Sequence, residues 1–354
     1  MHAQNSIVVV AKIVCANHGI CLDCRLTQAV YGDDMGDPNA APAARYFQPR
    51  RLGHVNLVVS DTERSMRFYN AVAGFEEAYR VAAIKGGFLS NGNTHHDIGM
   101  VESSGPSGRG RPPGLNHLAF ELETEVDLVH GYNRAIADGL SFDRTLDHDI
   151  SHSAYASDPD GNQCETYADV IRDWRDARNG VVTKPKPVWY PGLTEPCTER
   201  NYEIAPEIRR VEEAVFHPLR TKHATLVVSD MAAAVDFYTR RQGLRVLAGG
   251  ASRPLTILGG TCGERNLALL RAHADLQPGL HHIGFELRDD ADLDASLTRL
   301  KADGGSVDLH IEHPLRRAVF IRDPDGLRLQ FFIDRPAPDS AWEDLDPQLA
   351  LFLA

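Results

Sequence analysis

Residues 54–74 read HVNLVVSDTERSMRFYNAVAG, and residues 223–243 repeat the pattern as HATLVVSDMAAAVDFYTRRQG. The two stretches share His, Ser, Asp, Phe, Tyr and Gly, each pair 169 positions apart. Two further pairs are 165 positions apart: GLNHLAFEL at 114–122 with GLHHIGFEL at 279–287, and ASDPDGNQCETY at 156–167 with IRDPDGLRLQFF at 321–332. Identity at fixed spacing in three motifs indicates a tandem duplication of one unit of structure.

Each copy shows the same order of local elements. Residues 55–59 are apolar and mostly β-branched, which predicts a strand. The following Ser60-Asp61-Thr62-Glu63 matches a capping box that opens a helix, and Gly74 ends that helix. Short strands follow, and the order then restarts with a strand at 116–122 and a helix at 125–137. Each copy is therefore expected to contain two βαβββ units, so that the chain carries four.

This repeat sets the domain organisation. We expect an α+β protein in which the four βαβββ units pair into two tandem domains, each with an open β-barrel sheet. A proline-rich stretch separates the two copies. The expected boundaries are an N-terminal extension at 1–49, a first domain at 50–172, a linker at 173–219, a second domain at 220–335 and a C-terminal tail at 336–354.

The composition restricts the class of partner. Of 354 residues, 43% are apolar and 24% are charged, which is typical of globular domains. The net charge of −12 argues against nucleic acid or an anionic membrane as the main partner. No stretch approaches the roughly 18–20 apolar residues that a membrane span requires. We therefore expect a cytoplasmic protein that acts on a small molecule.

Three residues of the first copy could bind a metal ion. His54 opens the first strand of one unit, His117 has the equivalent place in the next unit, and Glu165 lies in the last strand. If the paired units curl into one barrel, the three side chains can meet at one interior point. Two neutral imidazoles and one carboxylate form the facial triad of non-haem Fe(II) oxygenases, which leaves positions open for substrate and dioxygen. A structural zinc site would have four protein ligands instead.

The second copy provides an internal control for this prediction. His223 and His282 stand at the matching positions, but Gln330 replaces the carboxylate. An amide lacks the negative charge that offsets the charge of the metal. The sequence therefore predicts one metal per chain, held by the first copy, and a second domain that is not catalytic.

These residues and the paired units resemble the vicinal oxygen chelate superfamily, and within it the type I extradiol catechol dioxygenases. The resemblance implies that His96, the second member of a His-His pair, is the acid–base residue. It also implies that His148 and Tyr155 are catalytic, as donors of hydrogen bonds to the substrate. In the second copy Arg265 and Phe320 replace His96 and Tyr155, and we expect no histidine to match His148.

The complete set of residues lies in the N-terminal half of the chain. The motif SDPDGNQCETYAD at 157–169 is similar to a branch that resembles the catechol-2,3-dioxygenases of bacilli. The resemblance implies an enzyme of aromatic compound catabolism that inserts both atoms of O2 into a catechol-type aromatic. It also implies Fe(II) as the cofactor, with Mn(II) sharing the same ligand set, and a homo-oligomer.

Two other functions stay open. A glyoxalase-like lyase or isomerase of the same superfamily would generally have a fourth protein ligand at the end of the first unit, where residues 98–101 offer none and Glu102 lies at the edge. A metal-free small-molecule-binding protein of the bleomycin-resistance kind would not need the complete set of residues. We expect Phe88 and Trp189 to line the substrate pocket, and Asp158 to Gly161 to form only a turn.

Overall fold

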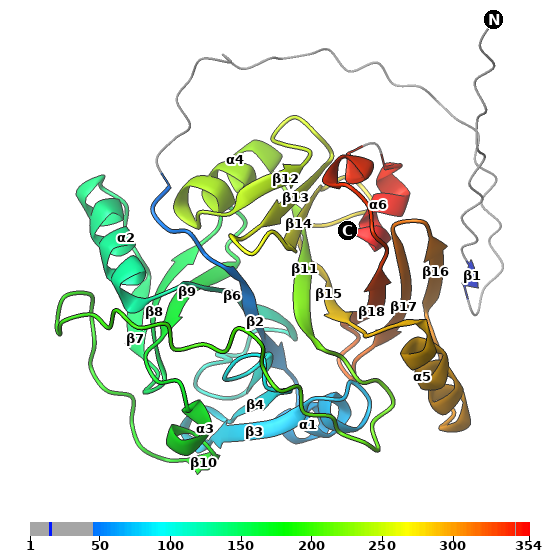
Figure 1. Ribbon diagram of the computed structural model, residues 1–354, viewed down its shortest axis with the longest axis horizontal. Coiled ribbons are helices and arrows are strands. Elements are labelled where there is room, and N and C mark those ends of the chain that lie inside the picture. Colours follow the sequence, from blue (N-terminus) through cyan, green and yellow to red (C-terminus); the bar gives the residue numbers. More distant parts are fainter. Residues whose placement is uncertain (1–13, 16–44, 344) are drawn as a thin grey trace, which may run out of the picture.

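The computed structural model describes residues 14–15, 45–343 and 345–354. Most of the expected N-terminal extension, 1–49, therefore lies outside the described residues. The described chain forms two nine-stranded mixed sheets with helices beside them, and each copy supplies eight strands of one sheet. The ninth strands, β1 and β10, come from the N-terminal extension and the linker. Figure 1 shows the first copy in blue to green and the second in yellow-green to red, with β2 and β11 near the centre. This architecture confirms the predicted α+β class with two domains.

The first sheet has the strand order β10-β3-β4-β5-β2-β6-β9-β8-β7. Its two units are β2-α1-β3-β4-β5 and β6-α2-β7-β8-β9, and they meet where β2 pairs with β6 in antiparallel fashion. The elements are β2 (Arg51–Val59), α1 (Thr62–Ala71), β3 (Glu76–Val81), a 3-10 turn η1 (Ala82–Ile84), β4 (Gly86–Ser90), β5 (Ile98–Glu102), β6 (Gly114–Glu121), α2 (Glu125–Ala137), β7 (Arg144–Asp147), β8 (Ser151–Ser157), β9 (Gln163–Asp169), α3 (Trp174–Ala177) and β10 (Gly180–Val182).

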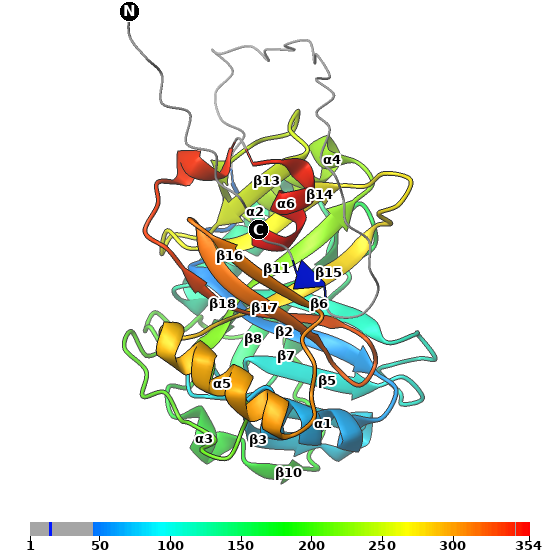
Figure 2. The same cartoon turned by 90° about the vertical axis from the view of Figure 1, so that its right-hand side faces the viewer.

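The second sheet has the order β1-β16-β17-β18-β15-β11-β14-β13-β12. Its strands β11 to β18 repeat the plan of β2 to β9, but β1 is added beside β16, at the end opposite to the place that β10 takes in the first sheet. Figure 2 shows β16, β17 and β18 on the face toward the viewer. The elements are β1 (Val14–Cys15), β11 (Arg220–Val228), α4 (Met231–Asp236), a π-helical turn η2 (Phe237–Arg241), β12 (Arg245–Ala248), β13 (Leu255–Gly259), β14 (Arg265–Arg271), β15 (Gly279–Glu286), α5 (Asp290–Ala302), β16 (Leu309–His313), β17 (Arg316–Arg322), β18 (Arg328–Asp334), η3 (Asp339–Trp342) and α6 (Pro347–Leu353).

The start of α1 differs from the predicted capping box. Asp61 is the residue that caps the helix, because its side chain accepts a hydrogen bond from the backbone N–H of Arg64. Ser60 instead donates its backbone N–H to the Asp325 carboxylate of the second copy, at 2.9 Å. The conserved spacing of Ser and Asp in the two copies therefore serves two purposes, a local cap and a contact between the copies.

The Asp-Pro-Asp-Gly tetrapeptides are more than the simple turns that the sequence predicts. Asp158 accepts a hydrogen bond from the Tyr238 hydroxyl at 2.9 Å, and Asp323 accepts one from the Tyr69 hydroxyl at 3.2 Å. The next carboxylate of each tetrapeptide binds the Ser that precedes the opposite helix. Each turn thus holds the first helix of the other copy. This reciprocity explains why the motifs persist in both copies.

A single apolar core joins the two domains. Buried side chains of both sheets belong to one continuous cluster, and the Phe75 and Phe285 rings meet edge to face across it at 5.0 Å. Gly74, at φ +84°, brings its Cα so close to the backbone of Phe216 that a β-carbon would lie 2.0 Å from the carbonyl oxygen. No helix in the described ranges is long and apolar enough to span a membrane.

Candidate metal centre

The register of four neighbouring strands gathers the predicted ligands. His54 on β2 lies opposite Ala119 on β6, which pairs in turn with Glu165 on β9. Tyr155 on β8 is directly opposite Glu165. Paired residues point to the same face of a sheet, and so do residues two apart on one strand. His117, two residues before Ala119 on β6, therefore points to the same face. All four side chains therefore point into the concave face of the first sheet.

The two imidazoles and the carboxylate converge on one point. Nε2 of His54 and Nε2 of His117 lie 3.3 and 3.0 Å from the same Glu165 oxygen, Oε2. One nitrogen or oxygen from each of the three residues falls within 4.8 Å of the others. All three side chains are buried. The structure thus brings together the three residues that the sequence predicts as ligands.

The protonation of these groups fits a divalent cation. Burial lowers the pKa of His54 to about 4, so its imidazole is neutral. Burial would raise the pKa of Glu165, but hydrogen bonds with His117 and His54 outweigh it and hold that pKa well below the usual range. His117 Nδ1 lies 2.8 Å from the Asn116 side-chain oxygen, and this contact orients the ring so that Nε2 faces Glu165. Two imidazole nitrogens around a buried carboxylate form a donor set that suits a divalent cation.

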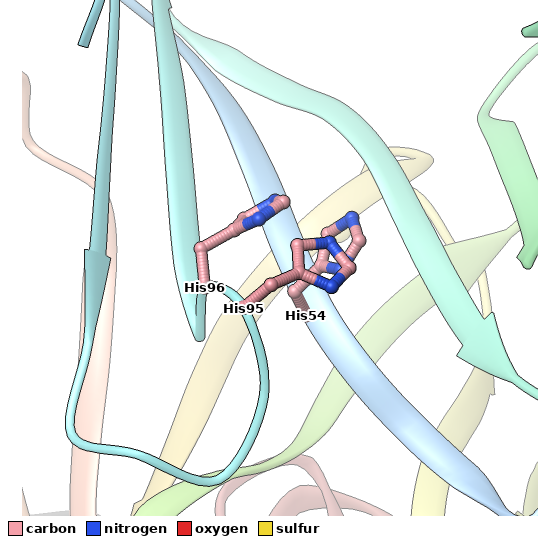
Figure 3. A group of neighbouring side chains, drawn as sticks. All are labelled: His54, His95 and His96. Atoms are coloured by element: carbon pink, nitrogen blue, oxygen red, sulfur yellow. The ribbon is translucent and has the colours of Figure 1, made fainter. Parts of the chain in front are cut away.

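His54 also belongs to a second group, with His95 and His96 from the segment between β4 and β5 (Figure 3). His95 Nδ1 lies 3.0 Å from the Asp169 carboxylate, and His96 Nδ1 lies 3.2 Å from the Tyr79 hydroxyl. This group contains no carboxylate to offset the charge of a metal. The group with Glu165 is therefore the better candidate. The buried His96 Nε2 has no hydrogen-bond partner among the described residues.

The other two predicted catalytic residues, His148 and Tyr155, also lie next to Glu165. His148 Nε2 is 3.1 Å from the Tyr155 hydroxyl and 3.7 Å from Glu165 Oε1. Burial lowers the pKa of His148 and raises that of Tyr155, so the imidazole is neutral and the phenol keeps its proton. Ser153, which the sequence did not single out, donates its hydroxyl to Glu165 Oε1 and fixes the carboxylate.

A cavity of about 440 Å³ opens beside these residues. Phe88 lines it, as predicted, and stacks on Tyr79 with ring centroids 4.6 Å apart. The prediction for Trp189 is wrong. Its indole stacks on His152 at 4.3 Å in a separate apolar cluster beside α2, so it is not part of the cavity wall.

Strand β5 offers no fourth ligand. Its residues on the concave side are Gly99, opposite Asn56, and Val101, which lines the cavity. Glu102 is at the strand end, where it forms an ion pair with Lys85 at 2.7 Å. In the described chain, the position where a glyoxalase-like enzyme would carry its extra carboxylate therefore has an apolar residue.

The equivalent place in the second copy is filled by an arginine. Arg316, at the position that matches Ser151, donates to Gln330 Oε1 at 3.0 Å and lies 3.4 Å from His223 Nε2. Its guanidinium also donates to the Asp334 carboxylate at 2.8 Å. Arg316 is fully buried. The Arg316 guanidinium thus occupies the place where the first copy gathers its candidate metal ligands.

The expected C-terminal tail, 336–354, closes this second centre (Figure 1). The backbone oxygens of Phe352 and Ala354 accept hydrogen bonds from Gln330 and Thr225, both at 2.7 Å. Trp342 is buried in the same cluster. The remaining space is about 10 Å³.

The expectation that no histidine of the second copy matches His148 is wrong. His313 lies 165 positions after His148, at the end of β16, so a histidine does match His148. Its Nδ1 accepts the backbone N–H of Leu315 at 3.2 Å, which ties it into the turn before β17. The position is kept, but its side chain serves the turn.

Comparisons with known proteins agree with this geometry. The Glyoxalase/Bleomycin resistance protein/Dioxygenase superfamily matches residues 51–166 and 220–331. A catechol-2,3-dioxygenase of Bacillus subtilis (strain 168) is 27% identical over 80% of this chain and 97% of its own length. The solved 2,3-dioxygenase LapB from Pseudomonas sp. KL28 is 18% identical with a TM-score of 0.61, covering 83% of this chain and 96% of that one. A Mn(II)-bound glyoxalase from Novosphingobium aromaticivorans is 17% identical with a TM-score of 0.58, covering 82% and 89%.

Proposed function

The chain belongs to the Glyoxalase/Bleomycin resistance protein/Dioxygenase superfamily, and we propose that within it the chain acts as an extradiol ring-cleaving dioxygenase on a catechol-type aromatic. The observation that carries the proposal is the buried triad of His54, His117 and Glu165, with an open cavity on one side. The similarity to a catechol-2,3-dioxygenase over nearly that protein's whole length supports the same reaction.

We assign the metal to the triad of the first copy. Fe(II) bound there, or Mn(II) with the same ligand set, would supply Lewis acidity to the two diol oxygens and a site for dioxygen. His54 and His117 would hold it through neutral nitrogens and Glu165 through its anionic oxygen. Ser153 would keep that carboxylate in one orientation through its hydrogen bond to Oε1.

Tyr155 and His148 would bind and orient the substrate oxygens. The Tyr155 hydroxyl keeps its proton because burial raises its pKa, so it can donate a hydrogen bond to oxygen that becomes more negative during the reaction. His148 Nε2 lies within hydrogen-bond distance of the Tyr155 hydroxyl, at 3.1 Å, and this contact restricts the orientation of the hydroxyl.

His96 would hold and move a proton at Nε2. Burial lowers its pKa well below the ordinary value, so the imidazole begins neutral and can accept a proton from the diol. Its Nε2 has no hydrogen-bond partner within the described chain, while Nδ1 is positioned by Tyr79. The same nitrogen could later return that proton to the substrate.

The cytoplasmic location and the homo-oligomer stay predictions.

Anaerobic reconstitution with Fe(II), followed by oxygen uptake over a panel of catechols, tests the proposal. We expect one O2 consumed per catechol and a yellow ring-opened product. The Glu165→Gln variant, which copies the second domain's residue into the first, should show no uptake above background. Metal-loaded protein that consumes no oxygen with any catechol would contradict the proposal, and metal-dependent isomerisation of another substrate would favour the glyoxalase-like alternative.

A further inference from the structure

The wall of the cavity carries an excess of positive charge. Five basic side chains line it: Arg109, Arg111, Arg144, Arg178 and Lys186. Glu165 is the one carboxylate among the described residues that line the cavity. The whole chain has a net charge of −12, so this concentration of cations is opposite to the general character of the protein.

Most of these cations have no anionic partner. Arg178 pairs with Asp149 at 2.6 Å. Within the part of the chain that the structure describes, none of the other four forms an ion pair. Among the residues that the structure describes, the Arg111 side chain donates only to the backbone oxygens of Gly108 and Ser107, at 3.2 and 3.1 Å. Hydrogen bonds to neutral carbonyls satisfy the N–H groups but leave the charge uncompensated.

Two of the cations without an ion pair contact residues that we propose to bind the substrate, Tyr155 and His148. The Arg144 guanidinium lies over the Tyr155 ring at 4.1 Å and donates to the Gln163 amide oxygen at 2.8 Å. Lys186 Nζ, which reaches the cavity from the linker, is 2.8 Å from His148 Nδ1. An aromatic diol held by Tyr155 and His148 would therefore have cations within reach of its substituents.

The second copy shows the opposite arrangement. Arg316, Lys222 and Arg265 all point at one carboxylate, Asp334, at 2.8, 3.1 and 3.1 Å. There the protein supplies its own anion and the cavity is closed. In the first copy the cations face an open cavity, so the missing anion can come from the ligand.

We infer that the substrate is an aromatic vicinal diol that carries a carboxylate, and that Arg111, Arg144 and Lys186 bind this carboxylate. The inference rests on the proposed function for the diol, and the cationic wall adds the acidic substituent. Repulsion among the cations of the wall supports this inference. Burial lowers the pKa of Arg111, and the charges of Arg109 and Arg144 lower it further. A bound carboxylate would relieve the repulsion among these arginines.

The test compares each acid with its uncharged amide. Binding of 2,3- and 3,4-dihydroxybenzoate and of the corresponding dihydroxybenzamides is measured by calorimetry on the anaerobic, Fe(II)-loaded full chain. We expect at least one acid to bind about ten- to a hundredfold more tightly than its amide, the range for a hydrogen bond to a charged group. Raising the salt concentration should reduce this ratio.

Single variants assign the effect to residues. Arg111→Gln, Arg144→Gln and Lys186→Gln should each reduce the acid-to-amide ratio severalfold or more, because each removes one charge from the wall. Arg67→Gln, which removes the same charge from the exposed face of α1, should leave the ratio unchanged.

The outcomes separate this inference from the proposed function. Equal affinities for acid and amide, or no binding of either, would overturn the inference, even if neutral catechols are cleaved. A preference for the acid that the three variants abolish supports the inference, even if no catechol consumes oxygen and the proposed reaction fails.

Discussion

In the first copy, Glu165 faces His54 and His117 beside a cavity of about 440 Å³, whereas in the second copy Gln330 faces the Arg316 guanidinium and about 10 Å³ remains. The strand register around the two centres is the same. Burying a charge is costly unless a partner offsets it, so each centre needs a balanced set of groups. In our proposal a metal provides that balance in the first copy, whereas in the second copy the Arg316 guanidinium and the Asp334 carboxylate provide it within the chain.

The contacts that join the copies show no such divergence. Both Asp-Pro-Asp-Gly turns bind the opposite tyrosine and the opposite Ser. The side chains that determine how the domains pack are retained on both sides, while those around the candidate metal centre are retained on one. We propose that the second copy supports the first and carries no second active site.

The largest effect is expected when the second copy is removed. Residues 35–180 expressed alone should aggregate or fold poorly, because the core shared by the two sheets would become an exposed apolar patch. Size-exclusion chromatography and circular dichroism measure this. A soluble, monomeric and fully active fragment would show that the second copy contributes nothing structural.

A matched pair of substitutions compares the two copies at one position. His96→Phe should keep its metal and its bound catechol but lower turnover by about 10²–10⁴-fold, the range for a positioned proton-transfer group. Arg265→Gln, 169 positions later, should leave turnover within about twofold. Loss of metal in the His96 variant would make His96 a ligand and would favour the glyoxalase-like alternative.

The next pair compares stability. Asp334→Asn should lower the free energy of unfolding by about 3–5 kcal/mol, because it leaves Arg316, Lys222 and Arg265 without their common anion. Asp169→Asn, at the equivalent place in the first copy, loses one hydrogen bond with His95 and should cost about 1–2 kcal/mol. Chemical denaturation of the metal-free chains measures both. Equal losses would refute the charge balance that we assign to the second centre.

The same carboxylate predicts a dependence of stability on pH. Burial would raise the pKa of Asp334, but Arg316, Lys222 and Arg265 outweigh it and hold that pKa well below the usual value. A carboxyl whose folded-state pKa is depressed stabilises the fold above its unfolded pKa of about 3.9, and this contribution is lost as the pH falls further. The free energy of unfolding should therefore fall more steeply below about pH 4 in the natural chain than in Asp334→Asn. Parallel curves would contradict this reasoning.

The sequence predicts the first copy better than the second. Repetition at fixed spacing puts His54 and His117 at equivalent places in two units, and their meeting with Glu165 follows from the sequence only if the paired units form one barrel. Nothing in the local pattern shows that Arg316 turns inward, because an arginine at a strand start is usually exposed. The closing of the second centre by residues 336–354 depends on long-range packing, and its one signal is the apolar LALFLA at the end of the chain.

The cationic wall was also outside the reach of the sequence. Arg111, Arg144 and Lys186 lie in three separate segments, and only the folded chain shows that they line one cavity. The prediction that Trp189 lines the pocket is wrong for a related reason. An aromatic residue in a linker has many surfaces available, and here it packs on His152.

The most direct test of the account is the metal content of two variants that change the same position in the two copies. After anaerobic loading with Fe(II) and removal of excess metal, the natural chain and Gln330→Ala should each retain one metal per chain, and Glu165→Ala should retain almost none. Two metals per chain, or equal loss in both variants, would contradict the assignment of a single metal centre to the first copy.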